Sequence, residues 1–309
     1  PGHRGRLREV VPPSVSYDRE HFFEATDGTR VFGEEFGQGG PPVVLTDGIG
    51  CDGFVWRYLA PSLGEHRRVV HWHFRGHGRS GPPADPARLG IENLAEDLRT
   101  VRDTLGFERP VIAAHSMGVQ VALEYYRQHP NDVAGLVLMC GTFGKITTTF
   151  HGTDLLDQVL PGLLRGTELF PSCARALWGR VPAALAFRVA CAGRELDRDR
   201  IREEDFERYW EHSALMNPDV FLRMLRAAGR HDAKEFLNDV RAPTLVVAAE
   251  LDTFTPMALA DEMARSIPEA ELEVIEDASH AAPVEQPRRI VDRVEEFLSA
   301  RVTSAEAQR

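Results

Sequence analysis

The sequence has few cysteines, no long apolar run and no excess of positive charge, and each shortage excludes a class of protein. Its four cysteines, Cys51, Cys140, Cys173 and Cys191, include no CxxC pair. Scattered cysteines predict free buried thiols in a reducing compartment, so we expect a cytoplasmic protein. A Cys173–Cys191 bridge within one helical segment is the alternative.

A membrane helix needs about 18 consecutive apolar residues, and no run in this chain approaches that length. Residues 1–14 hold basic side chains without the apolar core of a secretory signal. The formal net charge of the 309 residues is −11, whereas nucleic-acid phosphates require clustered Lys and Arg. We therefore expect a small-molecule partner, with no nucleic acid and no membrane. The sequence does not indicate an oligomeric state.

What the chain does contain is a regular alternation of strand-like and helix-like segments. A hairpin pattern at 20–36 comes first, with the turn signal Asp27-Gly28 inside it. Parallel strands need crossover helices, so the alternation after it predicts a largely parallel sheet covered by helices on both faces. The strand-like segments lie at 42–46, 68–74, 110–115, 133–140, 242–252 and 271–276, and those at 42–46, 133–140 and 242–252 are of the buried type.

The alternation stops at Gly144, and only helical patches follow until about Val240. The strand pattern then resumes, which indicates that the helical stretch is inserted into one sheet. We expect three parts. They are an N-terminal arm at 1–18, an α/β core at 19–143 and 241–309, and a helical insertion at 144–240.

Residues 111–125 read VIAAHSMGVQVALEY and place Ser116 between a strand and a helix. A serine hydroxyl becomes a nucleophile when it is exposed beside a base and near amide donors. A tight strand-to-helix turn gives that exposure, but it requires small residues two positions before and after the serine. Ala114 and Gly118 meet the requirement. The alternative is that Ser116 only caps the helix.

A base and an acid are available later in the chain. Asp252 and His280 each follow a strand-like run, as Ser116 does. The loops after parallel strands open on one edge of the sheet, so the three side chains should share that edge. Glu250 is the rival acid, but it falls on the strand. The simpler alternatives are a turn aspartate at 252 and a solvent-exposed histidine at 280.

This chain order of serine, aspartate and histidine on a strand–turn–helix elbow resembles the α/β-hydrolase family. The segments AHSMG, RGHGRSG, ELDTFTP and the final Ser-His loop carry the resemblance, which covers about residues 20 to 300. It implies an eight-stranded, mostly parallel sheet with 144–240 as a helical cap. It also implies that Ser116, Asp252 and His280 are catalytic, that the backbone N–H groups of Met117 and Ile49 form the oxyanion hole, and that no cofactor or metal is required.

The sequence departs from the family pattern in three places. Ala114 stands where the elbow usually has a glycine. Asp47 stands in a loop that commonly carries His-Gly, and His73 stands where an aspartate is common. None of these changes removes a catalytic group, but the hydrogen bonding around the loop of Asp47 stays open.

Four other histidines need an interpretation. His71, His73 and His77 resemble a metal-binding cluster, with His71 and His73 on one face of a strand. No carboxylate or cysteine stands beside them at a ligand spacing, so we expect a hydrogen-bonded cluster rather than zinc. His115 is expected to point away from Ser116 and to be structural.

Together these features predict a serine hydrolase that cleaves a carboxylic ester of a small, mainly apolar molecule through an acyl-enzyme. Phe54, Trp56 and Phe143 are candidates for lining the substrate pocket. A C–C bond hydrolase, a lactonase and a perhydrolase would use the same three side chains. A small-molecule receptor without catalysis is the non-enzymatic alternative.

Overall fold

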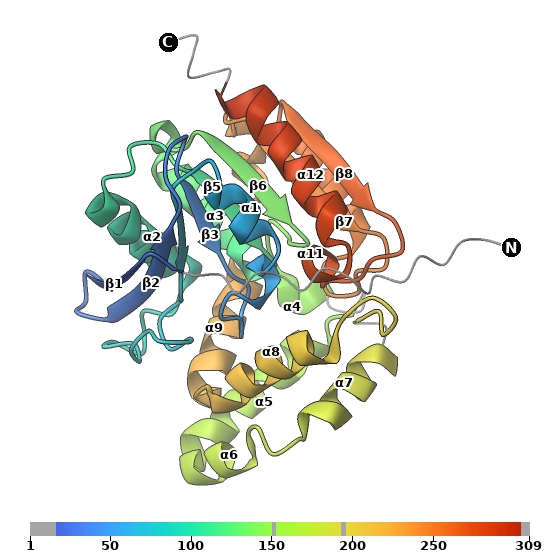
Figure 1. Ribbon diagram of the computed structural model, residues 1–309. Helices are drawn as coiled ribbons and strands as arrows, with labels where there is room; N and C mark the ends of the chain where they lie inside the picture. Colours follow the sequence, from blue (N-terminus) through green and yellow to red (C-terminus); the bar gives the residue numbers. More distant parts are fainter. Residues whose placement is uncertain (1–16, 150–152, 193–195, 304–309) are drawn as a thin grey trace, which may run out of the picture.

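The computed structural model describes residues 17–149, 153–192 and 196–303, and its centre is a twisted sheet with helices on either side (Figure 1). The sheet has eight strands in the order β1-β2-β4-β3-β5-β6-β7-β8. β2 pairs antiparallel with β1 and β4, and every other pairing is parallel. The strands are β1 (Arg19–Glu24), β2 (Arg30–Phe36), β3 (Val43–Thr46), β4 (Val69–Trp72), β5 (Val111–His115), β6 (Gly135–Met139), β7 (Thr244–Ala249) and β8 (Ala270–Ile275).

Helices cover both faces of this sheet, as the sequence pattern predicts. Every residue of β3, β4, β5, β6 and β7 is buried, which explains their continuous apolar runs. Two apolar clusters form the core, one against α2 and α3 and the other against α1 and α12. The helices of the core are α1 (Leu59–Gly64), α2 (Ile91–Leu105), α3 (Met117–Gln128), α10 (Met257–Ser266), α11 (Ala282–Glu285) and α12 (Pro287–Phe297), with shorter turns η1 (Phe54–Trp56), η2 (Pro130–Asp132) and η5 (Leu298–Thr303).

The chain between β6 and β7 forms a separate group of helices beside the sheet (Figure 1). α5 packs on α9 and α7 packs on α8. An isolated bridge joins Gly144 to Asp232, so this segment leaves the sheet and returns to it at nearly the same place. Its elements are α4 (Ile146–Thr149), α5 (Leu155–Leu169), α6 (Pro171–Leu177), α7 (Ala183–Ala192), α8 (Glu203–Leu215), α9 (Pro218–Arg230) and η4 (Lys234–Asp239).

The four cysteines are free thiols. Cys51 and Cys140 are buried as expected, but the expectation is wrong for Cys173, which is exposed on α6 because that helix packs through few of its residues. In the described part of the chain, no helix combines the length and the apolar composition that a membrane span requires. Residues 1–16 of the expected N-terminal arm lie outside the described residues.

Candidate active site

Ser116 lies on a sharp turn between the end of β5 and the start of α3. Its backbone has φ 55° and ψ −123°, a conformation that residues with a side chain rarely adopt. The turn is fixed because the N–H of Ser116 donates to the carbonyl of Met139, 3.0 Å away, at the end of β6. The hydroxyl is therefore presented at the N-terminus of α3, where the helix dipole favours negative charge.

The small residues around Ser116 permit a close approach between backbones. A Cβ atom added to Gly118 would lie 2.5 Å from the carbonyl oxygens of both Thr46 and Asp47. A Cβ atom added to Gly48 would lie 2.9 Å from the Cβ of Ser116. Glycine at positions 48 and 118 thus lets the loop after β3 pass directly against the serine.

The structure brings Ser116, His280 and Asp252 together although they are far apart in the sequence. The Nε2 of His280 lies 3.0 Å from the Oγ of Ser116, and its Nδ1 lies 2.9 Å from the Oδ2 of Asp252. Both hydrogen bonds are satisfied at once when His280 is neutral with its proton on Nδ1, because Nε2 can then accept from the serine hydroxyl. Such a pair activates a serine for nucleophilic attack.

Further donors fix the carboxylate of Asp252. The N–H groups of Phe254 and Thr255 each donate to Oδ1 at 2.9 Å, and the hydroxyl of Thr255 donates to Oδ2 at 2.7 Å. Burial alone would raise the pKa of Asp252, but the protonated form of His280 and the hydrogen bonds from His280 and Thr255 hold it below its ordinary value. Thr255 is not among the residues predicted from the sequence, although a hydroxyl three residues after an aspartate in a loop is a recognisable turn signal. Glu250, the rival acid, instead accepts from the N–H of Asp277.

His115 supports the loop that carries His280. Its Nε2 lies 3.0 Å from the carbonyl oxygen of His280, and the two rings are 5.0 Å apart. Burial lowers the pKa of His115 to about 4, so the ring is neutral at pH 7 and donates this hydrogen bond. The expectation that His115 points away from the site is wrong, because the loop after β8 folds over the end of β5.

The two expected oxyanion donors lie on either side of Ser116. Met117 is the first residue of α3, so its N–H has no acceptor within the helix. Ile49 lies between Gly48 and Gly50 in the loop against the serine, and within the described residues its N–H makes no hydrogen bond. Among the described residues, neither N–H is engaged by a backbone acceptor.

Asp47 and the histidines of β4 form a buried polar cluster. The Nε2 of His71 lies 2.8 Å from the Oδ2 of Asp47, and the rings of His71 and His73 are 4.9 Å apart. Ligand atoms of Glu34, His71 and His73 lie within 4.8 Å of one another. The expectation that no carboxylate stands beside these histidines is wrong, because Glu34 comes from β2 and Asp47 from the loop after β3.

Hydrogen bonds and charge define the protonation of this cluster at pH 7. The N–H of Arg79 donates to the Nδ1 of His73 at 3.0 Å, so the neutral ring carries its proton on Nε2. Burial alone would lower the pKa of His71, but the charge and hydrogen bond of Asp47 raise it to about 9. His71 is therefore an imidazolium at pH 7, which agrees with a hydrogen-bonded cluster.

The three aromatic residues proposed for the substrate pocket lie in different places. Phe54 is buried with its ring 5.1 Å from that of Tyr209 on α8, and Phe143 is buried in the core cluster of α2 and α3. Trp56 lines a cavity of about 690 Å³ together with His71 and His73. The lining of that cavity does not include Ser116, Asp252 or His280.

The chain is similar to known proteins both in sequence and in structure. A model of the alpha/beta hydrolase fold matches residues 41–287. The chain is 26% identical over 242 residues to a putative carbamate hydrolase of Azorhizobium caulinodans, covering 78% of this chain and 85% of that one. It is 26% identical over 273 residues to 2-hydroxy-6-oxo-2,4-heptadienoate hydrolase of Pseudomonas putida, covering 84% and 90%. Among solved structures, a thermophilic esterase from Thermogutta terrifontis superposes with a TM-score of 0.75 at 25% identity, covering 92% of this chain and 99% of that one.

Proposed function

Since the chain belongs to the α/β-hydrolase fold family, we propose that it is a serine hydrolase that cleaves a carboxylic ester of a small, mainly apolar molecule. The observation that carries the proposal is the pair of distances at His280, 3.0 Å to Ser116 and 2.9 Å to Asp252. The similarity to an esterase structure across 92% of the chain supports the same reaction.

In the proposed reaction, the Oγ of Ser116 attacks the ester carbonyl while its proton passes to the Nε2 of His280. Asp252 stabilises the resulting imidazolium, and the N–H groups of Met117 and Ile49 bind the oxyanion. The C–O bond then breaks, and His280 gives its proton to the departing alcohol. A water molecule deprotonated by His280 attacks the acyl-enzyme, the acid leaves, and the proton returns to Ser116.

The helices at 144–240 are proposed to act as a cap over this site. Two hydrogen bonds support the assignment, since they connect this segment to the loops that carry the reacting groups. Ser213 on α8 donates to the carbonyl of Gly50, and the N–H of Asp197 donates to Glu285 near His280. An apolar acyl or alcohol group would then be enclosed between the cap and the sheet.

The proposal predicts that Ser116→Ala loses turnover of p-nitrophenyl acetate and butyrate by roughly 10⁴-fold or more. A fluorophosphonate probe should label the natural protein at Ser116 and leave the variant unlabelled. Ser172→Ala, at an exposed serine on α6, is the matched control and should retain full activity. Unchanged turnover in Ser116→Ala would show that the nucleophile is wrongly assigned.

A C–C bond hydrolase is the second candidate, because a relative of similar identity is a 2-hydroxy-6-oxo-2,4-heptadienoate hydrolase. The same nucleophile and base would serve both reactions, so the substrate decides between them. Turnover of a vinylogous diketone, with none of either p-nitrophenyl ester, would favour this second candidate. Ligand binding without any product would instead indicate a receptor.

A further inference from the structure

Both backbone polar groups of Gly50 are held by side chains from opposite sides. Its N–H donates to the Nε2 of His77 at 3.0 Å, and its carbonyl accepts from the Oγ of Ser213 at 3.0 Å. His77 belongs to the core, whereas Ser213 lies on α8. Gly50 directly follows Ile49, so these two hydrogen bonds fix the turn that contains Ile49 and passes against Ser116 at Gly48.

The hydrogen bonds of His77 define which nitrogen carries its proton. Because Nε2 accepts from Gly50, the proton of the neutral ring is on Nδ1, which lies 3.2 Å from the carbonyl oxygen of Arg75. Burial lowers the pKa of His77 to about 4, so the ring is neutral at pH 7 and keeps its acceptor. The ring is also in contact with Phe74 and with His212 on α8, at centroid separations of 5.7 and 6.1 Å.

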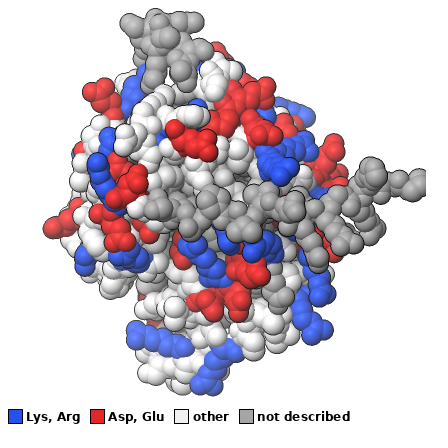
Figure 2. Space-filling view, in the orientation of Figure 1, with Lys and Arg blue, Asp and Glu red and all other residues white. Residues whose placement is uncertain are grey.

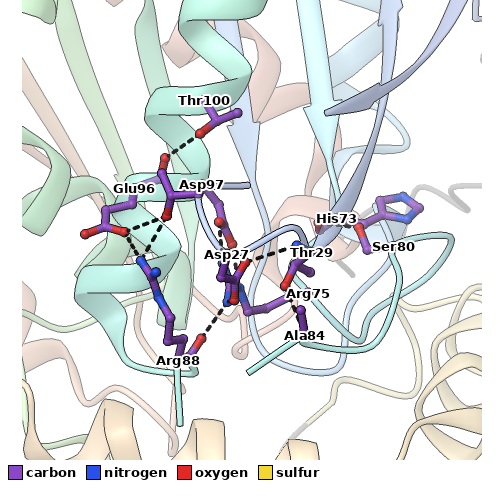
Figure 3. Close-up of polar contacts among 11 residues, drawn as sticks. Asp27, Thr29, His73, Arg75, Ser80, Ala84, Arg88, Glu96, Asp97 and Thr100 are labelled. Atoms are coloured by element: carbon purple, nitrogen blue, oxygen red, sulfur yellow. Dashed lines mark hydrogen bonds and ion pairs between the residues drawn. The ribbon is translucent and has the colours of Figure 1, made fainter. Parts of the chain in front are cut away.

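Arg75 anchors the loop from which His77 extends. Its side chain is fully buried and lies between Asp27 of the first hairpin and Asp97 of α2 (Figure 3). Two of its nitrogens donate to Asp97 at 2.8 and 2.6 Å, and a third donates to Asp27 at 2.8 Å and to the carbonyl of Arg88 at 2.9 Å. The carbonyl that holds the ring of His77 is therefore fixed to two elements of the core.

From these contacts we propose that His77 is a positioning residue that holds the Gly48-Ile49-Gly50 turn in the geometry needed to bind the oxyanion, with Ser213 fixing the same turn from the cap side. The inference rests on the proposed function, and it gives a role to the RGHGRSG segment that the hydrolysis mechanism leaves without one. His77 acts through Gly50 and does not touch the substrate.

Two variants of His77 separate the hydrogen bond from the ring. His77→Phe keeps a ring of similar size but has no acceptor for Gly50, whereas the side-chain oxygen of His77→Gln can take the place of Nε2. Losing one oxyanion donor costs roughly 10²–10³ in rate, so a displaced donor in His77→Phe should lower kcat on p-nitrophenyl butyrate by about 10- to 100-fold with KM nearly unchanged. His77→Gln should recover most of that loss, and His66→Phe, at an exposed histidine, should behave as the natural protein.

The hydrogen bond is measured independently of turnover by hydrogen–deuterium exchange at the amide of Gly50. Exchange should be faster in His77→Phe and close to natural in His77→Gln. If His77→Phe does not fold, Ser213→Ala gives the same test from the cap side and should lower kcat about 3- to 10-fold, with Ser213→Thr as its hydroxyl-retaining control.

A folded His77→Phe variant with natural kcat and natural exchange at Gly50 would overturn the inference, as would equal losses in the Phe and Gln variants. Failure of the proposed function has a different signature, because Ser116→Ala would then keep its turnover while exchange at Gly50 still responds to His77.

Discussion

Asp47 and His71 form a buried ion pair beside the turn that carries Ile49. At position 47 the α/β-hydrolase family commonly has a histidine, and an aspartate is common where this chain has His73. The two departures belong to one buried cluster, but Asp47 pairs with His71 and not with His73, which accepts from the N–H of Arg79. The Oδ2 of Asp47 has a charged partner, whereas its Oδ1 is buried without a hydrogen bond among the described residues.

This ion pair predicts a specific dependence of stability on pH. The pKa of His71 is raised from its ordinary value of 6.5 to about 9, so the stabilisation is complete below pH 6.5 and is lost as pH rises through 9. The free energy of unfolding should fall over this interval by at most about 3 kcal/mol. Thermal unfolding between pH 6 and 9.5 measures the fall, and Asp47→Asn should remove most of it. If the free energy of unfolding falls equally with pH in the natural protein and in Asp47→Asn, the shift in the pKa of His71 is not due to Asp47.

At the scale of elements, the contact between α3 and the loop after β3 depends on Gly118. An added Cβ would meet two carbonyl oxygens at 2.5 Å, which the backbone can relieve only by moving the helix away. Such a displacement would also separate Ser116 from the turn of Ile49. The packing of α3 against the loop after β3 and the geometry of the site therefore both depend on the absence of a side chain at Gly118.

Gly118→Ala is expected to lower the free energy of unfolding by about 2–3 kcal/mol, because it overpacks a closed contact. Gly162→Ala is the matched control, since nothing lies within 4 Å of an added Cβ in the middle of α5. That change should leave stability unchanged or raise it by about 0.5–1 kcal/mol. Urea denaturation measures both variants, and equal effects would show that the close approach at Gly118 costs nothing.

The elbow could be predicted from sequence because its requirements are local. Ala114, Ser116 and Gly118 lie within five residues, and the strand and helix on either side have clear periods. Asp252 and His280 followed from one rule, that loops after parallel strands share an edge. The largely parallel sheet followed from the alternation of strands and helices, and the helices between β6 and β7 followed from its interruption.

The cluster around His71 could not be predicted, because it depends on strand order. β4 lies between β2 and β3, with His71 opposite Glu34 in one neighbour and Leu45 in the other. No spacing along the chain reveals that register. The contact of His77 with Gly50 could not be predicted for a similar reason, since Gly50 belongs to a loop 27 residues earlier in the sequence.

At the scale of the whole molecule, the helices between β6 and β7 differ from the core in their surface. Acidic and basic side chains are interspersed over the core, whereas much of the lower part of Figure 2 is uncharged. The exposed apolar side chains of this segment include Leu155, Leu163, Leu169, Phe170, Leu177 and Val189. Apolar side chains of the segment also pack into both core clusters. Polar contacts add to this packing, and Glu285 makes one of them.

Glu285 is fully buried on α11 and joins this helical segment to the loop of His280. Its carboxylate accepts from the N–H of Asp197 at 2.8 Å and from the N–H and hydroxyl of Ser279 at 2.7 and 2.6 Å. In Glu285→Gln the side-chain NH₂ would face one of these donors, so the free energy of unfolding should fall by about 1–3 kcal/mol. Amide exchange at Asp197 should also accelerate, with exposed Glu296→Gln as the control. Natural exchange in Glu285→Gln would show that this contact does not hold the segment.

The closing helix α12 begins beside α11 and runs toward the end of the sheet that lies away from the helices between β6 and β7, where η5 follows it (Figure 1). The loops that carry Ser116, Asp252 and His280 open at the other end. If this protein is attached to a solid support through the surface near η5, the loops of Ser116, Asp252 and His280 would therefore face the solution. Immobilisation there should leave the entry of substrate unobstructed.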